Sequence, residues 1–262
     1  MAMRWLKPLN HPLTDWQGQR VWLVGASSGI GLACAQALHA AGAQVCVSAR
    51  QVNLLQDFVN THPGAVALPL DVTDALALSQ AAATLWADGG LDMVVYCAGY
   101  YTAQTATAYD LQSMQTHLSV NYSGALLMLD AVLPRLLAQG RGHISLVSSV
   151  AGFTGLPNSL AYGPTKAALT HLAEVLYVDL HQRGIGVSVV HPGFVATPLT
   201  AQNNFHMPAL ISPDEAAHAM LQGWREGEFD IHFPKRFTLF LKLLRLLPYR
   251  WYFPLVRRFT GM

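Results

Sequence analysis

Charged residues are scarce in this chain of 262 residues. Only 12% of the residues are charged, against 52% that are hydrophobic, whereas soluble domains average about 25% charged residues. This scarcity excludes a disordered chain, and it indicates an unusually large buried surface, either in an oligomer interface or against lipid. The formal net charge of +1 gives no reason to expect nucleic-acid binding.

Cysteine is also rare, and the three cysteines stand in apolar runs without metal-ligand spacing. Such cysteines predict reduced, buried thiols in a cytoplasmic protein. The 11 histidines show no ligand spacing beside carboxylates, so we expect no metal site. No stretch reaches the roughly 18 uncharged apolar residues of a membrane span. Residues 1–19 lack the continuous apolar core of a secretory signal.

Acidic residues are absent from the C-terminal segment 235–262, which we call the extension. The extension holds seven basic residues, so it carries +7, while the preceding chain carries nine basic and 15 acidic residues, or −6. Within it, 237–247 is mostly apolar, places Lys242 and Arg245 on one helical face, and ends at Pro248. Such a helix suits the surface of an anionic membrane. For a cytoplasmic protein this would be the inner surface of the membrane. The helix equally suits a subunit contact or a pocket cover, and both interpretations remain open.

Short β-branched apolar runs alternate with longer Ala/Leu-rich helical patterns along the rest of the chain. Strands that are apolar on both faces, each followed by a helix, predict a doubly wound parallel sheet of about seven strands, a Rossmann-like α/β fold. We expect one domain over residues 1–234, followed by the extension. The expected strands are Val21–Val24, Gln44–Ala49, Val66–Leu70, Asp92–Cys97, His143–Val147, Gly186–His191 and Phe229–Phe233, and the expected helices are Ile30–Ala41, Leu54–His62, Asp74–Ala87, Leu111–Ala138, Ala161–Arg183 and Pro213–Arg225.

A glycine-rich turn follows the first expected strand and opens the first expected helix. Its sequence is Gly25-Ala26-Ser27-Ser28-Gly29-Ile30-Gly31. Gly25 permits a tight turn, and Gly29 and Gly31 allow backbone amides at the helix N-terminus to approach a pyrophosphate. A glycine-rich turn without a ligand is the alternative interpretation.

The end of the second expected strand indicates which dinucleotide binds. At this position an NAD-binding site has an acidic residue that hydrogen-bonds the ribose 2′-hydroxyl. This sequence instead has Ala49 followed by Arg50. A guanidinium there can instead bind a 2′-phosphate, with Ser27 or Ser28 as an additional hydroxyl donor. The sequence therefore favours NADP(H) over NAD(H), with a solvated surface arginine as the alternative.

A second motif pairs a tyrosine with a lysine one helical turn later. Tyr162 and Lys166 have the i, i+4 spacing that puts both side chains on one face of a helix. A nearby ammonium favours the phenolate, so we expect Lys166 to lower the tyrosine pKa into a useful range. Ser149 follows another expected strand and can hydrogen-bond a substrate oxygen on which charge develops.

Taken together, these motifs resemble the short-chain dehydrogenase/reductase family, in its compact single-domain branch. The resemblance covers about Gly18 to Phe233. The pieces that match, in order, are Gly25-x-x-x-Gly29-Ile30-Gly31, Asp71-Val72, Ala98-Gly99, Asn121, Ser149, the Tyr162/Lys166 pair, and Pro192-Gly193 with Thr197.

The resemblance implies roles for four catalytic residues. Tyr162 would donate a proton to a carbonyl oxygen or remove it from an alcohol, and Lys166 would lower the tyrosine pKa and bind the nicotinamide ribose. Ser149 would orient the substrate oxygen. Asn121 would hold a water for proton relay, unless it is a polar residue that distorts its helix without taking part in the chemistry.

The resemblance also implies cofactor contacts and exposes two departures. Asp71 would contact the adenine, and Thr197 would bind the carboxamide and begin a mobile loop. Tyr96-Cys97 stands where the family usually has Asn-Asn, and Val24 replaces a threonine, which puts local packing in doubt. The expected cofactor site comprises Gly25, Ser27, Ser28, Gly29, Ile30, Gly31, Arg50, Asp71, Val72, Ala98, Gly99, Tyr162, Lys166, Pro192, Gly193 and Thr197.

These features predict an NADP(H)-dependent carbonyl reductase or alcohol dehydrogenase that forms a homo-dimer or homo-tetramer. Apolar residues around the site favour a lipophilic small-molecule substrate. A 3-oxoacyl-thioester reductase is the alternative enzyme, and a catalytically silent NADP(H)-binding sensor or scaffold is the alternative of another class. The expected substrate wall comprises Tyr100, Tyr101, Phe153, Leu156, Leu160 and the loop Phe194–Ile211 with Phe205 and Met207.

Overall fold

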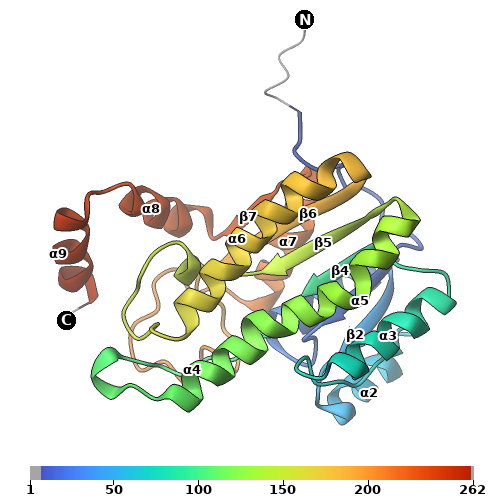
Figure 1. Cartoon of the computed structure of the whole chain (residues 1–262), viewed down its shortest axis with the longest axis horizontal. Helices are drawn as coiled ribbons and strands as arrows, with labels where there is room; N and C mark the ends of the chain where they lie inside the picture. The colour runs from blue at the N-terminus through green and yellow to red at the C-terminus, as the bar shows by residue number, and fades with distance from the viewer. Residues whose placement is uncertain (1–6, 261–262) are drawn as a thin grey trace, which may run out of the picture.

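The computed structural model of the protein describes residues 7–260. The first six residues of the expected domain and the last two of the expected extension therefore lie outside the described residues. Seven strands form one parallel sheet in the order β3-β2-β1-β4-β5-β6-β7, as the sequence predicted (Figure 1). The strands are β1 (Arg20–Val24), β2 (Gln44–Ser48), β3 (Val66–Ala67), β4 (Met93–Tyr96), β5 (Gly142–Val147), β6 (Ile185–Pro192) and β7 (Asp230–Phe233).

Helices cover both faces of the sheet. One apolar layer joins the sheet to α3, α5 and α6, and the other joins it to α1, α2 and α7. Strands buried between two such layers must be apolar on both sides, which is why each reads as a continuous hydrophobic run. The helices are α1 (Gly29–Ala40), α2 (Val52–Thr61), α3 (Ala75–Ala87), α4 (Leu111–Leu118), α5 (Gly124–Gln139), α6 (Tyr162–Leu180), α7 (Pro213–Glu226), α8 (Lys235–Arg245) and α9 (Tyr249–Thr260).

The strand order reverses between β1 and β4. The chain builds β1, β2 and β3 outward in one direction, then crosses back and adds β4 to β7 on the other side of β1. Open parallel sheets bind ligands beyond the carboxyl ends of the strands at such a reversal. The glycine-rich turn between β1 and α1 lies at this point.

The long helix expected over Leu111–Ala138 contains a π-helical turn, η3 (Ser119–Ser123), between α4 and α5. A π turn adds a residue to the helical repeat and re-aims the side chains around it. The Tyr96 hydroxyl donates a hydrogen bond of 2.6 Å to the Val120 carbonyl within this turn. Gly124 makes room for that phenol, because a Cβ there would lie 2.3 Å from the Tyr96 oxygen. Tyr96 therefore braces the π turn.

The extension folds into two helices rather than the single one that its apolar run suggested. α8 begins directly after β7, and α9 begins after Pro248, whose carbonyl accepts from the Trp251 and Tyr252 amides. Both helices lie on the side of the sheet toward which β5 points (Figure 1). This is also the side of the sequence motifs described above.

Candidate active site

At Gly25 and Gly31 the glycine-rich turn is packed too tightly for a side chain. Gly25 has φ +95°, and a Cβ there would lie 2.4 Å from the Ala98 nitrogen, while one on Gly31 would lie 2.2 Å from the Gly25 oxygen. The cap residue of α1, Ser28, makes no side-chain capping bond, so the first amides of the helix remain available to an anion. This cradle fits the pyrophosphate of a dinucleotide.

Arg50 lies beside the cradle with its side chain 69% exposed, and its guanidinium is 4.0 Å from the Asp71 carboxylate. Asp71 accepts hydrogen bonds from the Thr73 amide and hydroxyl. Although burial raises the pKa of Asp71, these bonds and Arg50 outweigh it, and the net pKa is lowered. Ser27 donates a bond of 3.0 Å to Gln51. An exposed guanidinium thus lies next to a carboxylate that is held by Thr73.

The three residues expected at the reacting atoms lie together. Ser149 follows β5 and hydrogen-bonds Tyr162, the first residue of α6. Lys166 lies one turn further along α6, with Nζ 5.4 Å from the centre of the Tyr162 ring. That Nζ donates a bond of 2.9 Å to the Val147 carbonyl. The end of β5 and the start of α6 therefore fix all three side chains.

Burial sets the protonation of this pair. Burial raises the pKa of Tyr162 to about 12, against a smaller lowering by the Ser149 hydroxyl. Burial likewise lowers the pKa of Lys166 to about 8. The expected lowering of the tyrosine pKa by Lys166 is not what this geometry gives, because the ammonium is directed to Val147 and desolvation of the phenol prevails.

Asn121 lies on the π turn and is fully buried. Its side-chain oxygen accepts from the Tyr100 amide at 2.7 Å, and its nitrogen donates to the Tyr100 carbonyl and the Thr165 hydroxyl, both at 3.0 Å. The amide thus ties the chain after β4 to the first turn of α6. A relay role for Asn121 stays a prediction.

The motifs surround one cavity of about 1080 Å³. Every residue expected to bind the cofactor lines it, as does Ser149, whereas Asn121 lies behind Gly99 and Lys166. Of the expected substrate wall, Tyr100, Tyr101, Leu156, Phe194 and Phe205 line the cavity. Phe153 instead packs against His191 and Leu241.

Comparisons with known proteins agree with this geometry. The family model described as short chain dehydrogenase matches residues 19–207. The chain belongs to the short-chain dehydrogenase family.

Relatives and solved structures point the same way. An uncharacterized oxidoreductase of Myxococcus xanthus (strain DK1622) is 36% identical over 231 residues, which is 86% of this chain and 91% of that protein. One of Staphylococcus aureus (strain MW2) is 33% identical over 76% of this chain and 87% of that protein. A short-chain dehydrogenase of Streptomyces avermitilis has a TM-score of 0.76 at 26% identity, covering 86% of this chain and 92% of that one. This dehydrogenase is therefore an oxidoreductase with the family's fold.

The extension of this dehydrogenase lines the same cavity, in agreement with the pocket-cover interpretation of its sequence. Apolar side chains of α8 and α9 meet the loop after Ser149, where Leu241 packs on Val150 and Phe153 and Tyr252 donates a bond of 2.7 Å to the Gly155 carbonyl. The sequence showed an apolar stripe but not what it faces. The extension residues on the cavity are Phe237, Phe240, Leu241, Leu244, Tyr252 and Val256.

Gly193 and Thr197 connect the extension to the cradle of this dehydrogenase. A Cβ on Gly193 would lie 3.0 Å from the Phe237 ring, and one on Gly29 would lie 2.9 Å from the Thr197 methyl. The segment from Gly193 to Thr197 therefore contacts α8 at its first residue and the phosphate cradle at its last.

Neither a metal site nor a membrane span occurs among the described residues. Within 7–260, no group of three or more His, Cys, Asp and Glu side chains is placed to hold a metal ion. No helix in that part of the chain is long and apolar enough to cross a bilayer. Cys34 and Cys46 are buried thiols, and Cys97 is partly buried.

Proposed function

We propose that this dehydrogenase reduces the carbonyl group of a lipophilic substrate with NADPH, Tyr162 being the proton donor. The observation that carries the proposal is one cavity that has the glycine cradle at one end and Ser149, Tyr162 and Lys166 beneath an apolar wall. A hydride donor and a carbonyl carbon bound in that cavity would meet beside the tyrosine hydroxyl.

The buried tyrosine is in the protonation state that reduction of a carbonyl needs. With its pKa raised to about 12, the Tyr162 hydroxyl carries its proton at neutral pH, the form that a general acid needs. Bound NADPH supplies the hydride to the carbonyl carbon. Tyr162 gives its proton to the carbonyl oxygen, and Ser149 hydrogen-bonds that oxygen as charge develops on it. Lys166, with a pKa of about 8, is mostly charged at neutral pH, and its ammonium lies 5.4 Å from the centre of the Tyr162 ring.

NADPH is preferred in this proposal because of Arg50. Its guanidinium is exposed beside the cradle, and charge-assisted, bidentate bonds to a 2′-phosphate suit it. At the end of β2, Ala49 offers no carboxylate for a ribose hydroxyl, and Asp71 is held by Thr73.

The cavity wall supports an apolar substrate. Leu156, Phe194 and Phe205 come from the dehydrogenase loops, and Leu241 and Leu244 come from the extension. The basic extension beside this wall also keeps a 3-oxoacyl thioester, whose carrier is often acidic, as the second candidate substrate.

The extension also supports a contact with an anionic membrane surface. Its outer face exposes Leu239 (51%), Leu243 (65%) and Leu246 (79%), and it carries seven basic residues without an acidic one. An exposed apolar stripe with a basic rim is the pattern of helices that lie in a membrane interface. We include this contact in the proposal because a lipophilic substrate would be concentrated there.

Apolar side chains exposed on other helices support a homo-dimer or homo-tetramer. They include Leu118 and Leu126 around the π turn and Val175 and Val178 on α6. Sedimentation equilibrium would give the mass of the assembly directly.

A turnover assay tests the proposed reaction. The purified protein is given NADPH or NADH and a panel that holds long apolar ketones, a 3-oxoacyl thioester, small ketones and sugars. We expect oxidation of NADPH with the long apolar ketones at the highest kcat/KM. NADPH binding without turnover on any carbonyl would contradict the proposal and favour a sensor or scaffold.

A further inference from the structure

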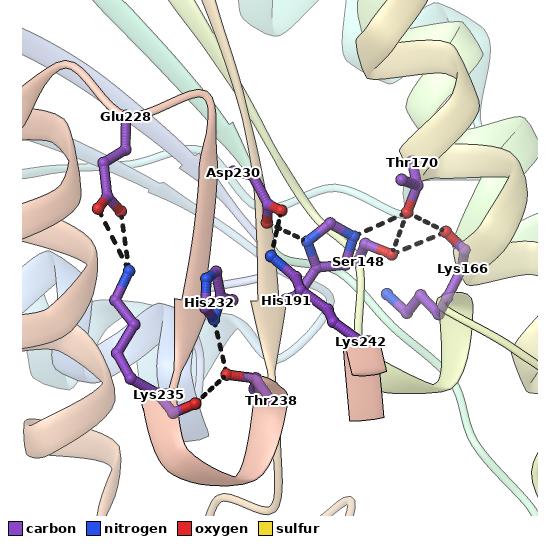
Figure 2. Close-up of polar contacts among 10 residues, drawn as sticks. All are labelled: Ser148, Lys166, Thr170, His191, Glu228, Asp230, His232, Lys235, Thr238 and Lys242. Atoms are coloured by element: carbon purple, nitrogen blue, oxygen red, sulfur yellow. Dashed lines mark hydrogen bonds and ion pairs between the residues drawn. The ribbon is translucent and has the colours of Figure 1, made fainter. Parts of the chain in front are cut away.

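A hydrogen-bonded series of polar side chains joins the extension to α6, the helix that carries Tyr162 and Lys166 (Figure 2). We call this series the link, and it takes no part in the reaction described above. Lys242 on α8 donates a bond of 2.6 Å to one oxygen of Asp230, the first residue of β7. The other Asp230 oxygen is 2.8 Å from Nδ1 of His191 on β6. The link therefore begins on the extension and passes through two adjacent strands.

The link continues to α6 and to the residues that follow β5. Nε2 of His191 lies 2.9 Å from the Thr170 hydroxyl on α6. The Thr170 and Ser148 hydroxyls lie 3.0 Å from each other, and each lies within hydrogen-bond distance of the carbonyl oxygen of Lys166, at 3.1 and 2.7 Å. Ser148 precedes Ser149 in the chain. Two of the proposed catalytic residues, Lys166 and Ser149, thus lie directly beside the far end of the link.

The link is partly buried and electrostatically strong. The His191 side chain is 2% exposed, and those of Asp230 and Lys242 are 36% and 30% exposed. Although burial raises the pKa of Asp230, the bonds and charges of His191 and Lys242 outweigh it and hold that pKa well below its usual range. Asp230 is therefore a carboxylate at neutral pH, and it needs both partners.

Apolar packing adds to the link at the point where the extension meets the loop after Ser149. The Phe153 ring contacts both partners of Asp230, with Nζ of Lys242 5.5 Å and the His191 ring 4.6 Å from its centre. Leu241, the residue before Lys242, packs on Val150 and Phe153 and lines the cavity. Lys242 thus fixes the turn of α8 that presents Leu241 and Leu244 to the cavity.

We propose that Lys242 is a positioning residue that, through Asp230 and His191, holds α8 as one wall of the substrate cavity and so determines which carbonyl substrates the site accepts. This inference rests on the proposed carbonyl reduction for its substrate but not for the link itself. Lys242 acts through the position of the extension and does not line the cavity within the described residues.

Lys235 provides a matched control on the same helix. It pairs with Glu228 at 3.2 Å, with 54% of its side chain exposed, and Figure 2 shows this pair apart from the link. Exposed pairs of this kind contribute little to stability. Lys235→Met therefore removes the same charge and the same type of ion pair from α8 without touching the link.

The test compares Lys242→Met, Lys242→Arg, Asp230→Asn and Lys235→Met with the wild type by two measurements. The first is hydrogen exchange of the α8 and α9 amides, which reports on the extension without any turnover. We expect exchange to rise about tenfold in Lys242→Met and Asp230→Asn, because local opening becomes easier when the link is broken. Lys242→Arg and Lys235→Met should stay near the wild type.

The second measurement is KM for a long apolar ketone relative to KM for a small ketone that does not reach α8. We expect this ratio to rise about tenfold in Lys242→Met while kcat changes less than about twofold, since α8 contributes to substrate binding and not to hydride transfer. Lys242→Arg should restore the ratio.

The outcomes separate the link from the proposed reaction. Unchanged exchange in Lys242→Met, or an equal rise in Lys235→Met, would overturn the inference, as would equal KM changes for both ketones. If exchange rises as expected and the wild type reduces no carbonyl, the link stands and the proposed function fails.

Discussion

Arg50 is the residue on which the proposed preference for NADPH depends. Arg50→Ala should weaken NADPH binding about 10- to 100-fold and leave NADH binding nearly unchanged, because a charge-assisted bond to the 2′-phosphate is worth about 1.5–3 kcal/mol. Fluorescence titration of both cofactors measures this. Arg183→Ala, in the turn after α6, is the control for loss of an arginine. Equal losses for NADPH and NADH would refute the preference.

His143 on β5 gives the protein an acid-sensitive core. Burial lowers the pKa of His143 from 6.5 to about 4, and Gly186 opposite leaves it room. A depressed folded-state pKa gives stability that is present above about pH 6.5 and is lost as the pH falls through about 4, since the unfolded chain binds the proton first.

We therefore expect His143→Gln to reduce the loss of unfolding free energy between about pH 7 and about pH 5 by about 2 kcal/mol. Urea unfolding at both pH values measures it. His218→Gln, at an exposed position, is the control. If His143→Gln loses as much unfolding free energy between these two pH values as the wild type does, His143 is not responsible for the loss.

At the scale of elements, the π turn between α4 and α5 depends on Tyr96. Tyr96→Phe removes the donor to the Val120 carbonyl, and the loss of such a hydrogen bond costs about 0.5–1.5 kcal/mol of unfolding free energy. Gly124→Ala should destabilise the protein by at least as much, because its Cβ would lie 2.3 Å from the phenol oxygen. Urea unfolding measures both, with the exposed Tyr109→Phe as control.

A double variant identifies the cause. If the phenol oxygen is what a Cβ at residue 124 meets, Gly124→Ala should cost less in Tyr96→Phe than in the wild type. Additive losses of unfolding free energy would mean that Tyr96 and Gly124 act separately.

The hydrophobic pattern predicted the positions of the strands because the strands are buried on both faces. It did not predict where β3 ends or where the helix over 111–138 is irregular. β3 ends at Ala67 rather than Leu70, although the Leu68 and Leu70 amides still donate to the Val47 and Ala49 carbonyls beside it. The helix over 111–138 was predicted as one element, with a distortion at Asn121 as an alternative role for that residue, which does lie in the π turn. Likewise, Tyr96 and Gly124 are far apart in sequence, and their contact could not be seen there.

The candidate site was predictable where backbone chemistry fixes the residue type. Gly25 and Gly31 are required by close approaches, and the Tyr162/Lys166 spacing follows from the helix. The protonation of Tyr162 was not predictable, because burial and the direction of the Lys166 ammonium depend on the packed structure. That Leu241 and Leu244 form the wall was not predictable for the same reason.

For the whole molecule, the extension has two apolar sides. Leu241 and Leu244 face the cavity, while Leu239, Leu243 and Leu246 are exposed. A helix placed this way can lie between a membrane surface and the substrate site, so that an apolar substrate needs to cross little water.

We expect the protein to float with vesicles that contain anionic lipid and to float less with neutral vesicles or at high salt. Replacing Leu239, Leu243 and Leu246 by serine should abolish flotation, whereas the exposed Leu54 and Leu76 serve as matched control positions. If the triple variant floats like the wild type, or changes only the mass of the assembly, the outer face is not a lipid contact.

Tyr162→Phe tests the central claim most directly. The variant keeps the ring and removes the proton donor, and Tyr177→Phe on the same helix, whose hydroxyl bonds Leu9, is its control. The measurement is kcat/KM for NADPH-dependent reduction of the best ketone. We predict a fall of about 10²- to 10⁴-fold with unchanged NADPH affinity in Tyr162→Phe and none in Tyr177→Phe. A Tyr162→Phe enzyme with nearly the wild-type kcat/KM would contradict the account.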